Sequence, residues 1–535
     1  MSPRAKKKPS GTVTFVGAGP GDPRLITLRA IEVLAEADVV VADQATLQTV
    51  LFHCKSGVEV LDPVTGDDGE LLSAVARAKV VLAAARSGKQ VVRAVAGDPC
   101  VDQSVTDEVT AVAKAKIVFE VVPGVPVSTA VPAYAGIPLH SAKGSGGVRV
   151  LDMAEATIDW ATVGSVDGTL VLRGALDSIA EIAQELVAGG RKPATPVAVT
   201  TNGTTTEQRT LVSTLAQVAS DVRSAKITLS AVVVVGDVVS QRDMLSWFET
   251  KPLFGWKVLV PRTKEQAASL SEQLRSYGAV PHEVPTIAVE PPRTPQQMER
   301  AIKGLVTGRY EWIAFTSVNA VRAVRERFED YGLDARAFAG IKVAAVGEAT
   351  ARALVEFGVK PDLVPSGEQS AAGLLEDWPP YDPVFDPIDR VFLPRADIAT
   401  ETLVAGLVEL GWEVDDVTAY RTVRAAPPPA ETREAIKGGG FDAVLFTSSS
   451  TVRNLVGIAG KPHAVTVIAC IGSATAKTAE EHGLRVDVMA PEPSVSALAE
   501  ALAEFGAARR VAMVEAGDPV TRPSERRPGS RRKAK

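Results

Sequence analysis

Hydroxyl and amide side chains follow two apolar runs in the second half of this chain, and each set opens a helical pattern. The two sets are Thr316, Ser317 and Asn319 after the run 312–315, and Thr447, Ser448 and Ser449 after the run 443–446. The first backbone N–H groups of a helix are unpaired, so hydroxyls beside them form a site for an anion such as a carboxylate. Simple capping of the helix start by Ser or Thr is the alternative for either set alone.

These sets belong to a longer internal duplication. Three motifs occur twice in the same order, at separations of 133, 131 and 125 residues: Pro-Arg at Arg262 and Arg395, Phe-Thr-Ser at Thr316 and Thr447, and Gly-x-x-Thr-Ala at Gly347/Thr350 and Gly472/Thr475. A repeat this long predicts two copies of a domain-sized α/β unit. An arginine after a strand can bind a substrate carboxylate through two parallel hydrogen bonds, although a structural salt bridge would also place it there. The paired motifs favour a ligand cleft.

Size and composition restrict the remaining function classes. The chain has 535 residues, 46% hydrophobic and 23% charged, which predicts three or four soluble domains. A net charge of −6 argues against a general nucleic-acid binder, and the three cysteines and five histidines lack metal-site spacing. No apolar run reaches the ~20 residues of a membrane helix, and no signal-peptide pattern follows the basic start, so we expect a cytoplasmic protein without a zinc site. We expect the basic segments 1–10 and 506–535 to be disordered tails, with an RNA or acidic partner as the less favoured alternative.

Alternating strand and helix patterns must position these residues, and they predict an α/β class with largely parallel sheets. Strands are expected at 13–16, 39–42, 91–95 and 118–122, and a helix at 23–37. A second cluster, at 169–172, 196–199 and 232–235, predicts a smaller α/β unit. We place the first domain at 11–250 and the main boundary at 246–255, where neither period holds.

The glycine-rich turn 17–23 in the first half would alone be weak evidence for a nucleotide site. Together with the runs 37–43, 92–99, 121–125, 132–138 and 202–204, it resembles the S-adenosylmethionine-dependent uroporphyrinogen-III C-methyltransferases. The resemblance implies a cofactor cleft between two α/β domains, with Asp43 as proton acceptor. The cofactor-binding residues that it implies are Pro20, Gly97, Asp98, Val101 and Gly203.

This half departs from that family at several positions. The loop 96–106 lacks the family's substrate-binding arginine, and no lysine stands near 61–64 at the proton-donor position. Pro126 replaces a threonine, and Arg173 replaces a methionine on the cofactor side. An arginine brings a positive charge toward a sulfonium cation. The departures predict that methyl transfer is weak or absent.

The duplicated half, residues 256–505, resembles uroporphyrinogen-III synthase. The resemblance implies two α/β domains between which the chain crosses twice, one formed by 256–288 with 423–505 and the other by 289–422. The family cyclises hydroxymethylbilane with inversion of the last pyrrole ring and loss of water, without a metal or redox cofactor. Tyr420 matches the family's tyrosine that assists hydroxyl loss, and a phenol is protonated at neutral pH. An ordinary half-buried strand tyrosine is the alternative.

The two resemblances therefore predict a synthase fused to a methyltransferase-like module. Such a fusion makes metabolic sense, because the product of the synthase is the substrate of the methyltransferase. One alternative is a bifunctional enzyme that also methylates uroporphyrinogen III to precorrin-2 with S-adenosylmethionine. A less favoured alternative is a non-catalytic sensor of a tetrapyrrole or adenosyl ligand. A homodimer through the N-terminal domain stays open.

Overall fold

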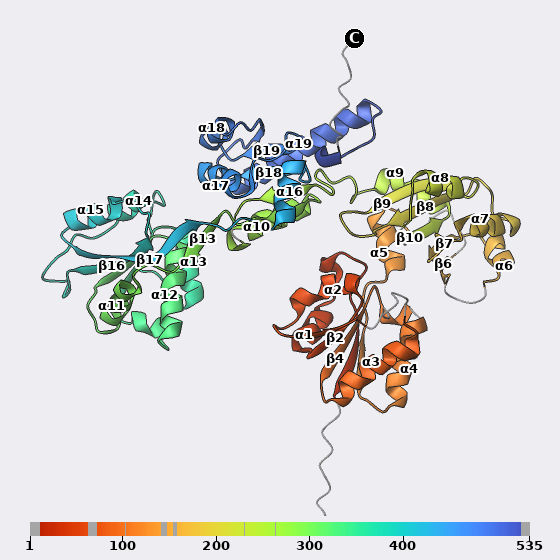
Figure 1. Cartoon of the computed structure of the whole chain (residues 1–535), viewed down its shortest axis with the longest axis horizontal. Helices are drawn as coiled ribbons and strands as arrows, with labels where there is room; N and C mark the ends of the chain where they lie inside the picture. The colour runs from red at the N-terminus through yellow and green to blue at the C-terminus, as the bar shows by residue number, and fades with distance from the viewer. Residues whose placement is uncertain are drawn as a thin grey trace, which may run out of the picture. The chain divides into compact units, whose positions relative to one another are not determined.

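The computed structural model describes residues 11–62, 72–101, 103–140, 147–153, 158–228, 231–262 and 264–525. The predicted tail 1–10 and the last ten residues, 526–535, of the predicted tail 506–535 lie outside this part of the chain. Two compact units divide the molecule: 1–256 with 274–280 and 503–520, and 257–273 with 281–502 and 521–535. Within the described residues, each unit contains two five-stranded sheets with helices, which confirms the predicted α/β class (Figure 1).

The first sheet is entirely parallel, with strand order β3-β2-β4-β1-β5. Its strands are β1 (Thr12–Gly17), β2 (Val39–Val41), β3 (Glu59–Leu61), β4 (Gln90–Val95) and β5 (Phe119–Val122). Helices α1 (Leu28–Glu36) and α2 (Gln44–Val50) pack on one face, and α3 (Ala74–Arg86) and α4 (Gln103–Lys114) on the other. Alternate strand residues such as Phe15 and Val16 therefore serve opposite cores. The helix predicted from residue 23 starts later, because Thr27 caps α1 by accepting a hydrogen bond from the Ala30 N–H.

The second sheet, with order β6-β7-β10-β8-β9, corrects the prediction of largely parallel pairing. Only β6 and β7 are parallel; β10 lies antiparallel between β7 and β8, and β8 and β9 form a hairpin. Its elements are β6 (Val148–Asp152), α6 (Trp160–Ser165), β7 (Thr169–Arg173), α7 (Ile179–Ala188), β8 (Pro196–Thr201), β9 (Arg209–Thr214), α8 (Val218–Ser224) and β10 (Ala231–Val235). Strand β10 is buried throughout, and a buried strand is continuously apolar whether its neighbours are parallel or antiparallel. The sequence of β10 therefore did not indicate its antiparallel pairing.

The second unit holds sheets of order β12-β11-β18-β19-β20 and β13-β17-β16-β14-β15, which we call sheets A and B. Sheet A comprises β11 (Lys257–Val260), β12 (Val280–Glu283), β18 (Ala443–Phe446), β19 (Val467–Cys470) and β20 (Val486–Met489), with α10 (Lys264–Ser276), α16 (Ala430–Gly438), α17 (Ser449–Ala459), α18 (Ser473–Glu481) and α19 (Val495–Glu515). Sheet B comprises β13 (Ile287–Glu290), β14 (Trp312–Phe315), β15 (Lys342–Ala345), β16 (Arg390–Ala396) and β17 (Glu413–Arg424), with α11 (Pro295–Val306), α12 (Val318–Asp330), α13 (Glu348–Phe357), α14 (Ala371–Glu376) and α15 (Thr402–Glu409).

The chain crosses between sheets A and B twice, which confirms the predicted crossings. It leaves sheet A after β12 and returns after β17, where the Ala425 N–H donates to the Thr286 carbonyl at 3.2 Å. Each sheet consequently receives one full set of duplicated motifs. Sheet A has the first Pro-Arg copy with the second copies of the other two motifs, and sheet B has the reverse.

The boundary segment packs on the first unit. Trp247 and Phe248, which follow α9 (Arg242–Leu245), contact the ring of Tyr134 at the end of α5 (Val127–Tyr134), and the Trp247 indole N–H donates to the Ala133 carbonyl at 3.0 Å. At the other end of the chain, residues 506–515 continue α19, so this part of the predicted tail is helical.

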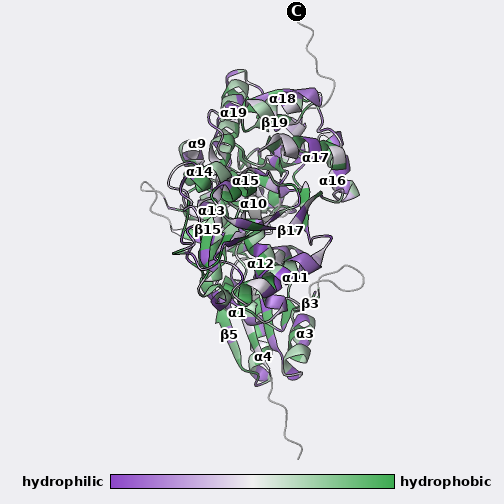
Figure 2. Cartoon of the chain, turned by 90° about the vertical axis from the view of Figure 1, so that its left-hand side faces the viewer, coloured by the Kyte–Doolittle hydropathy of each residue, from purple (hydrophilic) through white to green (hydrophobic). Residues whose placement is uncertain are grey.

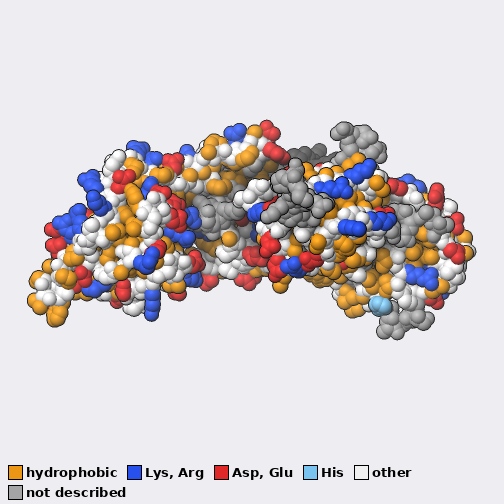
Figure 3. Space-filling model, turned by 90° about the horizontal axis from the view of Figure 1, so that it is seen from below, with side chains coloured by type: hydrophobic (Ala, Val, Ile, Leu, Met, Phe, Trp, Pro, Cys, Tyr) orange, Lys and Arg blue, Asp and Glu red, His pale blue; other side chains and the backbone are white. Residues whose placement is uncertain are grey.

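Surface chemistry is mixed in both units. Figure 2 shows hydrophobic residues in strands such as β15 and hydrophilic stretches on helices such as α11. In Figure 3, Lys and Arg lie interspersed with Asp and Glu, in keeping with the net charge of −6. No helix among the described residues is long and apolar enough to cross a membrane.

Candidate functional site

Tyr420 and Ser317 lie together in sheet B. The phenolic oxygen of Tyr420, on β17, is 2.9 Å from the Ser317 Oγ, which follows β14. Ser317 also caps α12, because its Oγ accepts a hydrogen bond from the Ala320 N–H at 3.1 Å. Tyr420 is only 7% exposed, and its hydroxyl is the polar end of a largely apolar side chain. Two residues 103 positions apart in sequence thus form one polar pair.

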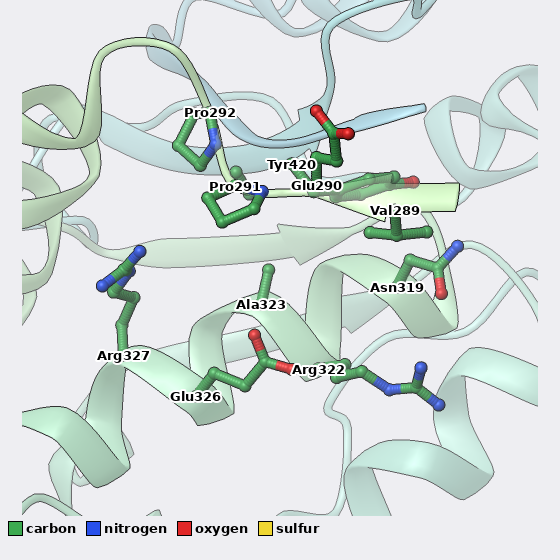
Figure 4. A pocket seen from close by; sticks show the side chains of 11 residues that line it. Val289, Glu290, Pro291, Pro292, Asn319, Arg322, Ala323, Glu326, Arg327 and Tyr420 are labelled. Atoms are coloured by element: carbon green, nitrogen blue, oxygen red, sulfur yellow. The ribbon is translucent and has the colours of Figure 1, made fainter. Parts of the chain in front are cut away.

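A cavity of about 120 Å³ lies beside this pair (Figure 4). Its volume is below the roughly 300 Å³ at which pockets for whole drug-sized ligands begin, so it suits one ring or one acid arm of a larger molecule. Asn319, which the sequence predicts as a substrate-binding residue, lines it. The complete lining is Val289, Glu290, Pro291, Pro292, Asn319, Arg322, Ala323, Glu326, Arg327, Ala419 and Tyr420.

The charged residues of this cavity were missed by the sequence reasoning. Arg322, Ala323 and Glu326 follow Asn319 at intervals of three, four and seven residues, and such spacing puts them on one face of α12. Helical periodicity counted from the Phe-Thr-Ser motif would have found them. Glu290, on β13, pairs with Arg421 at 2.7 Å across the antiparallel strands.

The two duplicated arginines have different surroundings. Arg395 is 7% exposed, and its Nε donates to Asp416 Oδ1 at 2.6 Å while Nη1 donates to the Thr400 carbonyl at 2.7 Å. Its Nη2 contacts both Asp416 and Glu401. The hydrogen-bonded carboxylate of Asp416 raises the pKa of Arg395 above its usual value. Arg262, after β11, is half-buried, and burial lowers the pKa of its guanidinium.

The two Gly-x-x-Thr-Ala motifs also differ. In sheet B, the Gln369 Oε1 accepts a hydrogen bond from the Glu348 N–H at 3.1 Å and closes the space beside Gly347. In sheet A, nothing lies within 4 Å of the position that a Cβ at Gly472 would take. Thr350 and Thr475 are both buried, each in the first turn of its helix.

The second Phe-Thr-Ser copy forms a capped helix start in sheet A. The Ser448 Oγ accepts from the Thr451 N–H at 3.3 Å, and the Thr451 Oγ1 accepts from the Ser448 N–H at 3.3 Å. The Ser449 Oγ donates to the Ala474 carbonyl at 3.0 Å, which joins α17 to α18. Thr316 and Thr447 are partly exposed at the ends of β14 and β18. The capping alternative therefore describes Ser317 and Ser448, each of which accepts from one backbone N–H in the first turn of its helix.

Glycine loops meet at the carboxyl end of the first sheet. Gly19 and Gly97 exchange two backbone hydrogen bonds, at 3.3 and 2.7 Å, which places Pro20 beside the Gly97 loop. The Asp98 carboxylate accepts hydrogen bonds from the Cys100 and Gly124 N–H groups at 2.7 and 3.0 Å. A Cβ at position 203 would collide with the Val131 side chain on α5, so glycine there lets the loop 202–204 pack closely against this helix.

Asp43 acts locally as a helix cap. Its carboxylate accepts from the Thr46 N–H at 2.8 Å and from the Thr46 Oγ1 at 2.9 Å at the start of α2. The segment compared with the family's lysine runs from Leu61 past Asp62, and its residues 63 and 64 lie outside the described part of the chain. The proposed acceptor role of Asp43 remains a prediction.

Arg173, at the end of β7, reaches the predicted cofactor loop. Its Nη1 donates to the Val101 carbonyl at 3.1 Å and lies 3.4 Å from Asp152 Oδ2. A guanidinium therefore lies against Val101, one of the residues assigned to cofactor binding. Asp152 offsets part of this positive charge, and the guanidinium still fills the space beside Val101.

Comparison with known protein families gives two matches. Residues 12–219 match the tetrapyrrole (corrin/porphyrin) methylases, and residues 268–500 match uroporphyrinogen-III synthase HemD. Each match covers the half in which the corresponding resemblance was found.

Individual relatives match either the whole chain or its first half. The porphyrin biosynthesis protein HemD of Ruminiclostridium josui is 31% identical over 505 residues, 93% of this chain and 98% of the relative. The S-adenosyl-L-methionine-dependent uroporphyrinogen III methyltransferase of Methanosarcina barkeri is 36% identical over 241 residues, 44% of this chain and 94% of the relative. The solved uroporphyrin-III C-methyltransferase of Thermus thermophilus is 30% identical, with a TM-score of 0.37 and coverage of 43% of this chain and 99% of that one. The chain belongs to the family in which a tetrapyrrole methylase domain is fused to a uroporphyrinogen-III synthase domain.

Proposed function

We propose that the second half cyclises hydroxymethylbilane to uroporphyrinogen III and that the first half no longer transfers methyl groups efficiently. The observation that carries the synthase proposal is the Tyr420 phenol, hydrogen-bonded to Ser317 at the wall of a small cavity. The match of residues 268–500 to the synthase family gives the reaction its class.

Tyr420 has the chemistry required for loss of the substrate hydroxyl. Ser317 can donate its hydroxyl proton to the phenolic oxygen, which leaves the Tyr420 proton free to protonate the departing hydroxyl. The carbon–oxygen bond then breaks and water leaves. The substituted α-carbon of the last pyrrole bonds to the electron-deficient methylene carbon, and its older bond to the neighbouring methylene carbon then breaks, which turns the pyrrole around. The free α-carbon of the turned pyrrole bonds to the released methylene carbon and loses its proton, so the atoms balance as one ring plus one water.

Ring inversion requires that the flexible chain be held in one folded shape. The substrate carries acetate and propionate carboxylates, which arginines and the N–H groups of helix starts can bind. Four helices begin with the duplicated motifs: α12 and α13 on sheet B, and α17 and α18 on sheet A. We propose these helix starts, with Thr316, Asn319, Thr350, Thr447, Ser449 and Thr475, as the substrate-positioning surface.

The first half fits the adenosyl cofactor only in part. Its converging glycine loops and Asp98 offer backbone groups of the kind that bind a nucleoside. Arg173, however, occupies space against Val101 and adds a cation that a bound sulfonium would meet. These residues do not fit a methyl-donating complex well, and no methyl-transfer step is assigned to them.

A bifunctional enzyme is the second candidate. Its support is the 36% identity of residues in the first half to a named uroporphyrinogen III methyltransferase. In that case Pro20, Gly97, Asp98, Val101 and Gly203 would bind S-adenosylmethionine, and Asp43 would accept the proton released from the substrate.

The synthase proposal is tested by supplying freshly prepared hydroxymethylbilane to the full-length protein and separating the oxidised products by isomer. We expect the type III isomer in excess of the type I isomer that forms without an enzyme. Type I alone would contradict the proposal and favour a ligand-binding, non-catalytic role.

A further inference from the structure

The two duplicated arginines differ in whether the fold already satisfies them. All three guanidinium nitrogens of Arg395 donate hydrogen bonds to acceptors in the protein: the Asp416 carboxylate, the Thr400 carbonyl and the Glu401 carboxylate. Asp416 lies on the neighbouring parallel strand, in the register where Leu393 faces it. A bidentate carboxylate pair of this kind holds β16 to β17 and leaves little capacity for a ligand.

Arg262 occupies the equivalent place after β11 in sheet A. Among the side chains that the structure describes, none forms an ion pair or a hydrogen bond with its guanidinium, and its backbone N–H bonds to the Val260 carbonyl at 2.9 Å. The side chain is nevertheless half-buried. Partial removal of a cation from water is unfavourable unless a partner compensates for it, so an anion that binds there would recover lost solvation.

The position of Arg262 suits a tetrapyrrole acid arm. Strand β11 runs parallel to β18, and β18 runs parallel to β19, so the residues after these three strands gather at one edge of sheet A. That edge carries Arg262, Thr447, Ser449 and Thr475, and the space beside Gly472 is open. The equivalent edge of sheet B has its arginine paired and its second helix start closed by Gln369.

We infer that the duplicated halves have divided roles: Arg262 binds an acetate or propionate carboxylate of the tetrapyrrole, whereas Arg395 stabilises the fold. This inference rests on the proposed synthase function. It gives sheet A the arginine that anchors the substrate and leaves the proton-donating tyrosine to sheet B.

The test compares Arg262→Gln with Arg395→Gln in the full-length protein, with Arg262→Lys and Arg395→Lys as charge-retaining controls. Steady-state kinetics with hydroxymethylbilane are combined with fluorescence titration of uroporphyrin III, which measures binding without turnover. We expect Arg262→Gln to raise KM and the porphyrin Kd about tenfold to a hundredfold, with kcat within about twofold and Tm unchanged. Arg262→Lys should recover part of the affinity.

Arg395→Gln should instead lower Tm, with KM and Kd close to those of the unchanged protein when measured well below Tm. Unchanged KM and Kd in Arg262→Gln would overturn the inference, as would equal losses of affinity in both glutamine variants. If Arg395→Gln is too unstable for kinetics, the porphyrin titration is made with Arg395→Lys instead. That variant keeps the positive charge, and its Kd should stay close to that of the unchanged protein. Failure of the unchanged protein to form type III product would refute the synthase proposal itself, which separates the two conclusions.

Discussion

The phenolic oxygen of Tyr420 and the Oγ of Ser317 lie 2.9 Å apart and connect strand β17 to the start of helix α12. The cap places the serine, and the serine fixes the direction of the phenol at the cavity wall. An acid held in this way needs no rearrangement before it protonates a leaving hydroxyl.

Tyr420→Phe should lower kcat by about a hundredfold, at the low end of general-acid effects, because hydroxymethylbilane also loses its hydroxyl without an enzyme. The fraction of type I isomer should rise as the spontaneous reaction competes. Tyr310→Phe is the matched control: Tyr310 is buried in the same hydrophobic core as Tyr420 and donates to Asp415 at 2.6 Å, but it does not line the cavity. Its loss should cost about 1 kcal/mol of stability with kcat unchanged. Equal kcat in Tyr420→Phe and the unchanged protein would remove the acid role.

Ser317→Ala should reduce both stability and kcat, because it removes the α12 cap, worth about 1 kcal/mol, and the partner of Tyr420. Ser448→Ala removes the corresponding cap of α17, where the structure shows no tyrosine partner for that hydroxyl among the described residues. It should lower Tm similarly and leave kcat nearer to normal. The double variant Ser317→Ala/Tyr420→Phe should be no slower than Tyr420→Phe, since the two side chains act together. Additive losses in kcat would show that Ser317 acts independently of the phenol.

The sequence predicted much of this site because its signals are local. The Phe-Thr-Ser motif lies where a strand ends and a helix begins, and the resemblance supplied Tyr420. The sequence could not predict that Arg395, rather than Arg262, is paired with a carboxylate of the protein. Asp416 is 21 residues from Arg395 and becomes its neighbour only through strand pairing. The antiparallel second sheet was missed for a similar reason: a fully buried strand such as β10 is apolar whichever way its neighbours run. Residues 506–515 were assigned to the disordered tail, whereas they continue helix α19, and Arg510 within them donates to the Glu249 carbonyl at 3.3 Å.

Arg173→Met should improve binding of S-adenosylmethionine by about tenfold or more, because it removes a cation that would repel the sulfonium across a few ångströms. The gain should be smaller for S-adenosylhomocysteine, which has no sulfonium charge. Arg173→Lys should bind neither ligand better than the unchanged protein. Calorimetric titration with both ligands measures these differences. Tight binding of S-adenosylmethionine by the unchanged protein would contradict the proposed obstruction.

Cys100 in the first half and Cys470 in the second provide a further test of the structure. Cys100 is exposed overall, but partial burial of its thiol, and secondly the nearby Asp98 carboxylate, raises the pKa of that thiol. Burial raises the pKa of the Cys470 thiol to about 12. A raised pKa leaves less thiolate, so Cys100 should react with iodoacetamide more slowly than free cysteine at pH 8 and accelerate about tenfold per pH unit until its pKa is passed. Cys470 should react only after unfolding. Peptide mass spectrometry identifies which cysteine is alkylated first. Alkylation of Cys470 before Cys100 in the folded protein would contradict these assignments.

The same alkylation reports on ligand binding. Cys100 adjoins Asp98 and Val101 in the predicted cofactor loop, so a ligand bound there should protect it. We expect little protection of the unchanged protein by S-adenosylmethionine and clear protection of Arg173→Met.

The most direct measurement supplies the full-length protein with hydroxymethylbilane and methyl-labelled S-adenosylmethionine, then resolves the oxidised products by isomer and by mass. We predict type III uroporphyrin without labelled methyl groups. Labelled type III products would contradict the proposed loss of methyl transfer, and type I uroporphyrin alone would contradict the synthase function.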